Sequence, residues 1–505
     1  MIAKIYSAIP YGFEGRLIEV ESDANRGLPA FNIVGMANKT ISEARDRVRS
    51  AISNSGFSFP NQKTTVNLAP ADLAKDGSCL DLPIALSILV ISKQLLMDNV
   101  KKRLFVGELS LNGELRKIKG IINIVETAKK AGIKEVYLPI QNLPQASLVQ
   151  GIDIYGVDTL KNLFLHLKRQ ITLPSTIEPI PFTIKSPTNI ILDHIRGQEL
   201  AKRAMQIAIA GHHNILISGP PGSGKTLLAK AAANLLPDPT PLETVEITKI
   251  YSLANLSISD VVNSRPFRSP HHTASPTSIT GGGQSAAPGE ISLAHKGVLF
   301  LDELPEFPRS ILESLRQPLE DKTISISRAN QKITYPADFM LIATMNPCPC
   351  GYLGDKNHEC KCTTIQIQNY QKKLSGPLLD RIDIHIDVNK VDNKDLLTPL
   401  NSNRNEHNSV KNTIIQARKI QRERYGNCSF YNGSLSSFDI SKKLRLEPSA
   451  EQLLQSASEK LNLSARAYFK TIKVAQTIAD LAESNIISKN HIAEALTFRQ
   501  PITHI

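Results

Sequence analysis

The sequence contains no tryptophan, and aromatic residues make up only 5% of its 505 residues. So few rings argue against a broad aromatic surface on which bases or sugars would stack. Hydrophobic residues make up 41% and charged residues 21%, as in globular domains with buried cores, which excludes an intrinsically disordered chain. At about 150 residues per domain, the length predicts about three domains.

Long apolar runs are also missing. The most apolar stretch, residues 82–91, is half as long as the roughly 20 residues of a membrane-spanning helix, and it predicts a buried helix. The first residues lack the basic region and apolar core of a signal peptide, so we expect a cytoplasmic protein with no membrane segment. Six cysteines do not make a disulfide scaffold in a chain of this length.

Positive charge is in excess, because 59 Lys and Arg face 47 Asp and Glu, which gives a net charge of +12. Residues 401–505 carry 15 basic and 9 acidic side chains, or +6, so half of the excess lies in the last fifth of the chain. A basic protein of this kind favours a polyanionic partner, with nucleic acid as the first candidate.

The chain is predicted to be an α/β multidomain protein. Residues 1–170 mix short β-branched runs with helical stretches, as in an α/β or α+β domain. Residues 171–189 contain four prolines and predict an extended linker. Residues 190–392 alternate predicted strands and helices, and residues 393–505 begin with a polar connection and continue with helical periodicity.

A glycine-rich loop carries the strongest functional signal. It follows a strand-like segment, 214–218, and precedes a helical run, 227–236, which is the context of a phosphate-binding loop. The loop consists of Gly219, Pro220, Pro221, Gly222, Ser223, Gly224, Lys225 and Thr226. Its backbone amides would surround the phosphates of ATP, while Lys225 would reach the β- and γ-phosphates and Thr226 would ligate Mg²⁺.

Two further polar sites follow apolar strands. Residues 298–301 predict a buried strand that ends in Asp302 and Glu303. We expect Asp302 to hold hydrated Mg²⁺ and Glu303 to activate the attacking water as general base. Asn346 ends the next apolar strand, where it would either help Glu303 to orient the water or simply form a turn before a proline.

With residues 375–383, these elements resemble AAA+ ATPases of the magnesium-chelatase-like branch. Two longer segments, 265–272 and 288–295, narrow the resemblance to the competence-associated YifB/ComM family, and it covers nearly the whole chain. The resemblance implies a Lon-protease-like N-terminal domain, an AAA+ P-loop α/β core and a C-terminal helical lid domain. It also implies a hexameric ring helicase that uses ATP and acts on single-stranded and branched DNA, promoting branch migration during homologous recombination in natural transformation.

The resemblance also assigns two arginines. Arg381 matches the arginine finger, whose guanidinium would neutralise charge on the γ-phosphate bound by a neighbouring subunit. The alternative for Arg381 is a salt bridge to Asp380 or Asp383. Arg466 matches the sensor arginine of the lid, which contacts ATP, although Lys470 and Gln476 stand where the family commonly has arginine.

The N-terminal region resembles the protease domain of Lon-type proteins but departs from it at two positions. Cys79 stands where the nucleophilic serine belongs, and Ile122 stands where the lysine base belongs. Because an apolar side chain cannot accept the proton of a nucleophile, we expect no proteolysis. Cys79 is then a small core residue, and the domain is a scaffold or a DNA-binding collar.

Four cysteines form two Cys-x-Cys pairs separated by nine residues: Cys348, Cys350, Cys360 and Cys362. Four thiolates would suit tetrahedral Zn²⁺, and such a grouping is typical of a metal site in a reducing compartment. The single residue between the members of a pair is tighter than usual, so free thiols are the alternative, and His358 could replace one ligand.

Two basic segments are candidates for DNA contacts. Residues 324–334 alternate apolar and polar side chains around a polar tip, which predicts a β-hairpin whose Arg328 and Lys332 would contact phosphates without reading sequence. Arg268 is the candidate from a second cluster, which also contains Arg265, His271 and His272. For each of these residues, a solvated or structural role is the alternative.

Three functions are compatible with these features. A DNA motor is favoured by the resemblance, the basic charge and the complete set of ATPase residues. A remodelling ATPase acting on a protein partner, like the magnesium-chelatase subunit, is the second, and the basic C-terminal region and the Lon-like N-terminal region argue against it. The third, a binding module whose ATPase is only a switch, does not need both Glu303 and Arg381.

Overall fold

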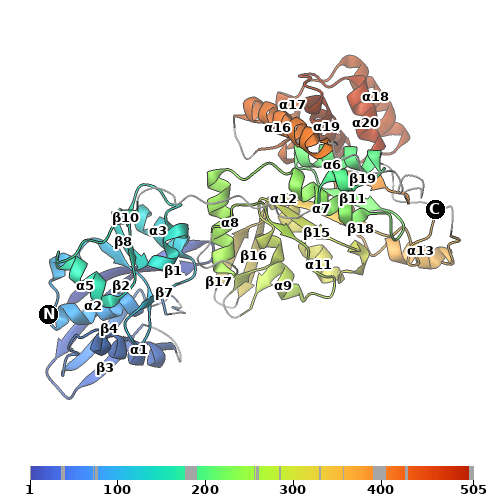
Figure 1. Ribbon diagram of the computed structural model, residues 1–505. Helices are drawn as coiled ribbons and strands as arrows, with labels where there is room; N and C mark the ends of the chain where they lie inside the picture. The colour runs from blue at the N-terminus through green and yellow to red at the C-terminus, as the bar shows by residue number, and fades with distance from the viewer. Residues whose placement is uncertain are drawn as a thin grey trace.

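The structure is a computed structural model that describes residues 2–35, 40–71, 73, 75, 78–176, 190–254, 256, 261–283, 286–328, 331–355, 358–390, 405–426 and 430–499. Three regions are visible in Figure 1: an N-terminal α/β region in blue and cyan, a central α/β region in green and yellow, and C-terminal helices in orange and red. Of the described helices, none is both long and apolar enough to cross a membrane.

The N-terminal region is built on an eight-stranded mixed sheet in the order β10-β9-β8-β5-β1-β2-β4-β3. Its strands are β1 (Ala3–Tyr11), β2 (Glu14–Asn25), β3 (Ala30–Val34), β4 (Lys63–Ala69), β5 (Arg103–Phe105), β8 (Glu135–Pro139), β9 (Asp153–Val157) and β10 (Ser175–Thr176). A short separate hairpin joins β6 (Glu108–Leu109) and β7 (Leu115–Arg116). The helices are α1 (Thr40–Asn54), α2 (Asp81–Ile91), α3 (Ile121–Lys130), α4 (Leu143–Ala146) and α5 (Leu160–Leu167).

Two sequence predictions for this region can be compared with the fold. Every residue of α2 is buried, which confirms the buried helix predicted for the most apolar stretch. The first part of the predicted linker 171–189 is not a free extended connection, because β10 pairs antiparallel with β9 and so extends the sheet. Residues 177–189 lie outside the described part of the chain.

The central region contains a five-stranded parallel sheet in the order β12-β15-β18-β11-β19. These strands are β11 (Ile215–Ser218), β12 (Phe267–Arg268), β15 (Val298–Leu301), β18 (Met340–Met345) and β19 (Ile384–Asp387). The helices are α6 (Glu199–Gly211), α7 (Lys225–Leu235), α8 (Pro241–Leu253), α9 (Pro276–Thr280), α10 (Glu290–Leu293), α11 (Arg309–Ser314), α12 (Arg316–Asp321), α13 (Thr364–Gln371) and α14 (Gly376–Leu379). Because the strands are parallel, the segments that follow β11, β15 and β18 meet at one edge of the sheet.

Two hairpins extend from the central region. The shorter joins β13 (Gly281–Gly282) to β14 (Ala287–Pro288), and the longer joins β16 (Thr323–Arg328) to β17 (Gln331–Pro336). The longer one confirms the β-hairpin predicted from the alternating pattern. Its Ile324, Ile333 and Tyr335 are buried in the core of the central region, which fixes the base of the hairpin.

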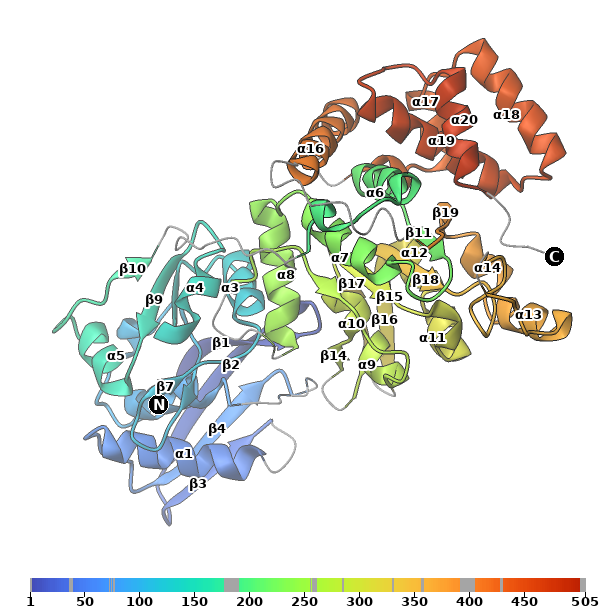
Figure 2. The same cartoon turned by 45° about the vertical axis from the view of Figure 1, so that its right-hand side comes forward.

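The C-terminal region is helical, as predicted. Its helices are α16 (Glu406–Tyr425), α17 (Ser437–Lys443), α18 (Pro448–Lys460), α19 (Ala465–Leu481) and α20 (Lys489–Thr497). Figure 2 shows α16 and α19 next to α6 of the central region, and residues from all three helices share one hydrophobic cluster. The C-terminal helices, which the resemblance identifies as the lid, therefore pack on the central region through α6.

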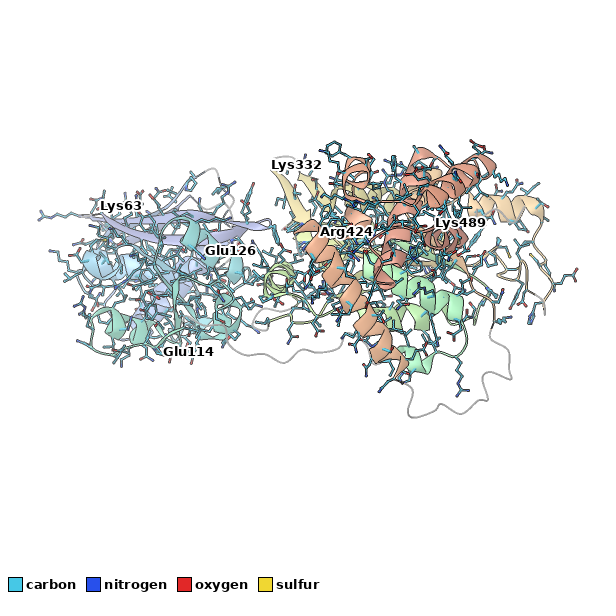
Figure 3. All side chains as sticks on the ribbon, turned by 90° about the horizontal axis from the view of Figure 1, so that it is seen from above. Lys63, Glu114, Glu126, Lys332, Arg424 and Lys489 are labelled. Atoms are coloured by element: carbon cyan, nitrogen blue, oxygen red, sulfur yellow. The ribbon has the colours of Figure 1, made fainter. Side chains whose placement is uncertain are left out.

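The N-terminal region also contacts the central region. Lys249 of α8 forms a 2.6 Å ion pair with Glu126 of α3 and lies 4.2 Å from the ring centroid of Phe13. A Cβ on Gly12 would lie 2.6 Å from Cγ2 of Ile333 in the β16–β17 hairpin. Figure 3 shows Glu126 on the side of the N-terminal region that faces α8 and the hairpin with Lys332. The turn between β1 and β2 thus packs against the hairpin.

Candidate active site

The glycine-rich loop lies between β11 and α7, as the sequence predicts. Gly222 and Gly224 have φ angles of +77° and +84°, in the left-handed region that favours glycine. No other atom lies within 4 Å of a Cβ built on either residue, so the requirement for glycine is conformational rather than steric. The loop ends at the N-terminus of α7, where backbone amides lack helical partners and can bind an anion.

Lys225 points back into this loop. Its Nζ donates hydrogen bonds to the carbonyl oxygen of Gly219 at 2.6 Å and to that of Pro220 at 2.9 Å. It also donates to Oδ1 of Asn346 at 3.3 Å, which brings together two residues that the sequence assigned to one site. These hydrogen bonds of the partly buried ammonium all go to neutral oxygens, so a phosphate oxygen would be a direct anionic partner for it.

Two hydroxyl groups hold Asp302. Thr226 donates to its Oδ2 at 3.1 Å, and Thr344 of β18 donates to its Oδ1. The hydroxyl of Thr344 also accepts a 3.1 Å hydrogen bond from the backbone N–H of Glu303. Hydroxyl and carboxylate oxygens are ligands that Mg²⁺ accepts, so Thr226 and Asp302 fit this ion. Sequence analysis missed Thr344, whose only signal was a polar residue inside an apolar strand.

The carboxylates of Asp302 and Glu303 differ in their surroundings, because Asp302 is held by the two hydroxyl groups described above. Glu303 is exposed and has φ 54° and ψ 53°, a left-handed conformation that costs a non-glycine residue about 1–2 kcal/mol. Strained backbone of this kind is frequent at functional sites. Burial lowers the pKa of Lys225 to about 8, although the carboxylates of Asp302 and Glu303 raise it. The site therefore contains a desolvated cation beside two acids.

The two expected arginines meet at a residue that sequence analysis missed. Arg381 donates from Nη2 to Oε2 of Glu320 at 2.6 Å, and Arg466 donates from Nη2 to Oε1 of the same carboxylate at 2.6 Å. Arg381 also donates from Nη1 to the carbonyl oxygen of Pro377 at 2.6 Å. Among the described residues, neither arginine contacts the glycine-rich loop of its own chain.

Arg381 does form a salt bridge, but among the described residues its partner is Glu320 and not Asp380 or Asp383, the partners considered as the alternative. Asp383 instead pairs with Lys470 of α19 at 2.7 Å. His213 lies 3.6 Å from the same carboxylate. Burial raises the pKa of Asp383, but Lys470 and His213 hold it well below its usual range. Lys470, which stands where the family commonly has arginine, therefore supplies a buried ion pair between lid and core.

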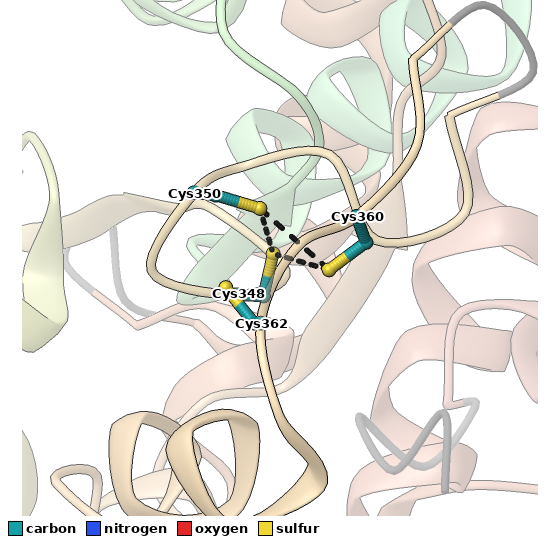
Figure 4. Close-up of side chains that lie close together, drawn as sticks. All are labelled: Cys348, Cys350, Cys360 and Cys362. Atoms are coloured by element: carbon teal, nitrogen blue, oxygen red, sulfur yellow. Dashed lines mark hydrogen bonds between the residues drawn. The ribbon is translucent and has the colours of Figure 1, made fainter.

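The four cysteines converge, as Figure 4 shows. The Sγ atoms of Cys348 and Cys350 are 3.3 Å apart, and Cys360 lies 3.7 and 3.6 Å from them. With Cys362, all four ligand atoms lie within 4.8 Å of one another. Tetrahedral Zn²⁺ with bonds of about 2.3 Å requires sulfur–sulfur distances of about 3.8 Å, whereas a disulfide requires about 2 Å. The donor set therefore fits zinc.

The cysteine loop packs directly on the glycine-rich loop. Gly351 has φ +83°, and a Cβ there would lie 2.6 Å from Cδ of Pro221. His358, considered as a substitute ligand, instead stacks on Tyr352 with 4.9 Å between ring centroids and is outside the sulfur cluster. Any change in the shape of the cysteine loop would therefore reach the phosphate-binding loop.

The basic candidates separate into two groups. Arg268 makes two 2.6 Å hydrogen bonds to Glu290, and Arg265 is buried against Glu243 at 2.8 Å, so both have the structural role considered as the alternative. Lys332 is exposed on β17. Arg328 is in β16, but its side chain lies outside the described part of the structure.

The two departures from a Lon-type protease are both buried. Burial and the nearby carboxylate of Asp81 raise the pKa of the Cys79 thiol to about 12, so the thiol is not an activated nucleophile. Ile122 is fully buried in α3. Cys79 belongs to the N-terminal hydrophobic core, which confirms its predicted role. Asp76 and Gly77, within the segment that resembles the nucleophile region, lie outside the described residues.

Comparison with known proteins gives matches along most of the chain. The family described as magnesium chelatase, subunit ChlI, matches residues 191–396, that described as subunit ChlI of Mg-chelatase matches 20–142, and the ChlI C-terminal family matches 404–499. The magnesium-chelatase 67 kDa subunit of Chlorobaculum parvum is 26% identical over 160 residues, which cover 31% of this chain and 23% of that protein.

Two relatives match over nearly their full lengths. The competence protein ComM of Haemophilus influenzae is 43% identical over 504 residues, which cover 99% of this chain and 97% of that protein. YifB of Escherichia coli is 40% identical over 499 residues, with 98% and 96% covered. Identity at this level over the whole chain, together with the geometry of the phosphate loop, places the chain in the YifB/ComM family of magnesium-chelatase-like AAA+ ATPases.

Proposed function

We propose that the protein is an ATP-driven ring motor that moves the branch points of DNA junctions during homologous recombination. The observation that carries the proposal is the separation of the phosphate loop from Arg381. The loop follows β11, whereas Arg381 precedes β19, which pairs in parallel with β11 from Ile215 to Ser218. The loop lies at the C-terminal ends of the parallel strands and Arg381 lies at their N-terminal ends. A four-residue strand separates these ends by about 13 Å. Arg381 thus serves the nucleotide of a neighbouring subunit.

Within one subunit, the residues divide the chemistry of ATP hydrolysis. Lys225 and the loop amides hold the phosphates, and Thr226 and Asp302 hold Mg²⁺, which supplies positive charge to the phosphate oxygens. Glu303 accepts a proton from the attacking water, and Asn346 orients that water. Arg381 and Arg466 of the adjacent subunit complete the site, which makes hydrolysis depend on a ring, hexameric by resemblance to the family.

The β16–β17 hairpin is the proposed DNA contact. Exposed Lys332 and neighbouring Arg328 would bind phosphates of single-stranded or branched DNA without sequence preference. Because the hairpin contacts the turn at Gly12, movement of the hairpin would also move the N-terminal region. DNA as the partner agrees with the net charge of +12 and with the name of the relative, competence protein ComM.

The cysteine cluster is proposed to hold Zn²⁺ that stiffens the loop packed on Pro221. The N-terminal region is proposed to keep a Lon-like fold as a scaffold without proteolysis. The protein is proposed to be cytoplasmic. Its proposed domains are a Lon-like domain at residues 1–170, a linker at 171–189, an ATPase core at 190–392 and a helical lid at 393–505.

The test compares ATP hydrolysis with and without DNA. Single-stranded or four-stranded junction DNA should raise the ATPase rate of the wild-type protein several-fold. Lys332→Ala should weaken DNA binding and reduce its dependence on salt, whereas a similarly exposed lysine of the N-terminal region, changed in Lys63→Ala, should not. An active ATPase that does not respond to DNA would favour the remodelling ATPase, which acts on a protein partner.

A further inference from the structure

Glu320 joins three separate parts of the chain. It lies on α12, while Arg381 follows α14 and Arg466 is in the first turn of the lid helix α19. The two arginines occupy different oxygens of its carboxylate, each at 2.6 Å. Slight burial raises the pKa of Glu320, but the two guanidinium groups hold it below its usual value. The carboxylate is therefore charged and shared.

Without this carboxylate, the two guanidinium groups would repel each other. Among the described residues, Glu320 is the only hydrogen-bond partner of the Arg466 side chain. Arg381 has a second partner in Pro377, and its Nε is buried with no hydrogen-bond partner in the described structure. Arg466, with 55% of its side chain exposed, would lose its fixed position, whereas Arg381 would keep one anchor.

We infer that Glu320 is a positioning residue, which holds Arg381 and Arg466 side by side so that both reach the nucleotide of the neighbouring subunit together. This inference rests on the proposed shared site. Glu320 itself lies with the arginines and contacts neither the glycine-rich loop nor its acids among the described residues. It belongs to the half of the site that a subunit gives to its neighbour.

The first test is the kinetics of Glu320→Gln, which removes the charge and keeps the shape. The turnover number of the assembled protein should fall at least tenfold, with the KM for ATP within about twofold, since the phosphate loop is unchanged. Glu320→Asp should recover part of the loss. The matched control is Glu494→Gln, because Glu494 also joins lid to core, through Arg203 at 2.7 Å, and among the described residues it forms no ion pair with Arg381 or Arg466. Equal turnover in Glu320→Gln and wild type, or a higher turnover, would overturn the inference.

The second test mixes variant chains, and it reports on Glu320 even if Glu320→Gln assembles poorly alone. Mixed with Glu303→Gln chains, Glu320→Gln chains should recover hydrolysis, because one interface then has an intact Glu303 facing an intact Glu320 and its arginines. Mixed with Arg381→Ala chains they should not recover, because every interface lacks part of the arginine half. The opposite pattern would overturn the inference.

The reference mixture is Arg381→Ala with Glu303→Gln. Recovery there supports the shared site independently of Glu320. If this mixture also stays inactive, the shared site itself is wrong and the proposed function fails with it. If the reference mixture recovers but the mixture of Glu320→Gln with Glu303→Gln does not, the shared site stands and the role of Glu320 is wrong.

Discussion

The hydroxyl of Thr226, at the start of α7, donates a hydrogen bond to the carboxylate of Asp302, at the end of β15, at 3.1 Å. These residues are 76 positions apart, and the parallel sheet brings them to one edge. The groups proposed for Mg²⁺ are thus arranged within one chain. Arg381, before β19, is at the opposite end of the parallel strands, and this separation is the basis for the proposal that neighbouring subunits share the site.

Lys225→Ala and Glu303→Gln should abolish activity for different reasons. Loss of the Lys225 ammonium removes charged hydrogen bonds worth about 1.5–3 kcal/mol, so ATP should bind about 10- to 100-fold more weakly. Glu303→Gln keeps the pocket, so ATP should bind as in wild type while hydrolysis falls about 10²- to 10⁴-fold. Nucleotide titration and phosphate release measure the two effects. Wild-type hydrolysis by Glu303→Gln would remove Glu303 as the general base.

Thr344→Val should impair the site although Thr344 does not contact the phosphate loop. The substitution keeps the volume but removes the hydroxyl that donates to Asp302 and accepts from the Glu303 backbone. The Glu303 N–H then lacks its acceptor and Asp302 lacks a donor, so Asp302 should be held less firmly, turnover should fall and half-maximal activity should need more Mg²⁺. Thr344→Ser is the matched control, because it restores the hydroxyl. An unchanged Mg²⁺ dependence in Thr344→Val would contradict the role of this hydrogen bond.

Protein purified without added metal should contain about one Zn²⁺ per chain. Changing Cys350 and Cys362 to serine should remove it, since two of four thiolates are lost, whereas Cys79→Ser should retain it because Cys79 is outside the cluster. Metal analysis by mass spectrometry checks both. Freshly reduced wild-type protein that contains no zinc would leave the four cysteines as free thiols.

Acid should destabilise the contact between the lid and the core at His212. Its ring stacks on Tyr431 with 5.1 Å between centroids, and burial lowers the pKa of His212 from 6.5 to about 4, although Asp338 raises it. Below pH 6.5 the unfolded chain binds a proton here that the folded chain does not bind until about pH 4. The free energy of unfolding should therefore decrease as the pH is lowered from 6.5 towards 4, by up to about 2 kcal/mol at pH 5.

The test for His212 is the midpoint of urea unfolding at pH 5 and pH 7.5 in wild type and His212→Asn. Asparagine tolerates the left-handed φ of 56° and does not titrate in this range. The variant should lose less stability than wild type between the two pH values. Equal losses would show that His212 does not contribute to the pH dependence.

The parts of the site that sequence analysis predicted are those encoded locally. The glycine-rich loop has its strand, turn and helix within one short segment, and Asp302 directly follows the short apolar run 298–301, which predicts a buried strand. The β16–β17 hairpin and the cysteine cluster were predicted for the same reason, because spacing along the chain sets their geometry.

The parts that were missed depend on contacts between distant segments. Glu320 meets Arg381 across 61 residues and Arg466 across 146, and no pattern around Glu320 indicates either contact. Arg268 was a candidate for a DNA contact, with a structural role as the alternative, because its pairing with Glu290 is not visible in the sequence. A charged residue on its own does not reveal whether its counter-ion is a protein side chain or a ligand.

The most direct measurement uses a labelled four-stranded DNA junction with homologous arms, purified protein, ATP and Mg²⁺. Wild-type protein should convert the junction to two duplexes at a rate that depends on ATP hydrolysis. Glu303→Gln should bind the junction and ATP without moving the branch point. A wild-type preparation that hydrolyses ATP and binds the junction, yet leaves the branch point in place, would show that the protein is not a branch-migration motor.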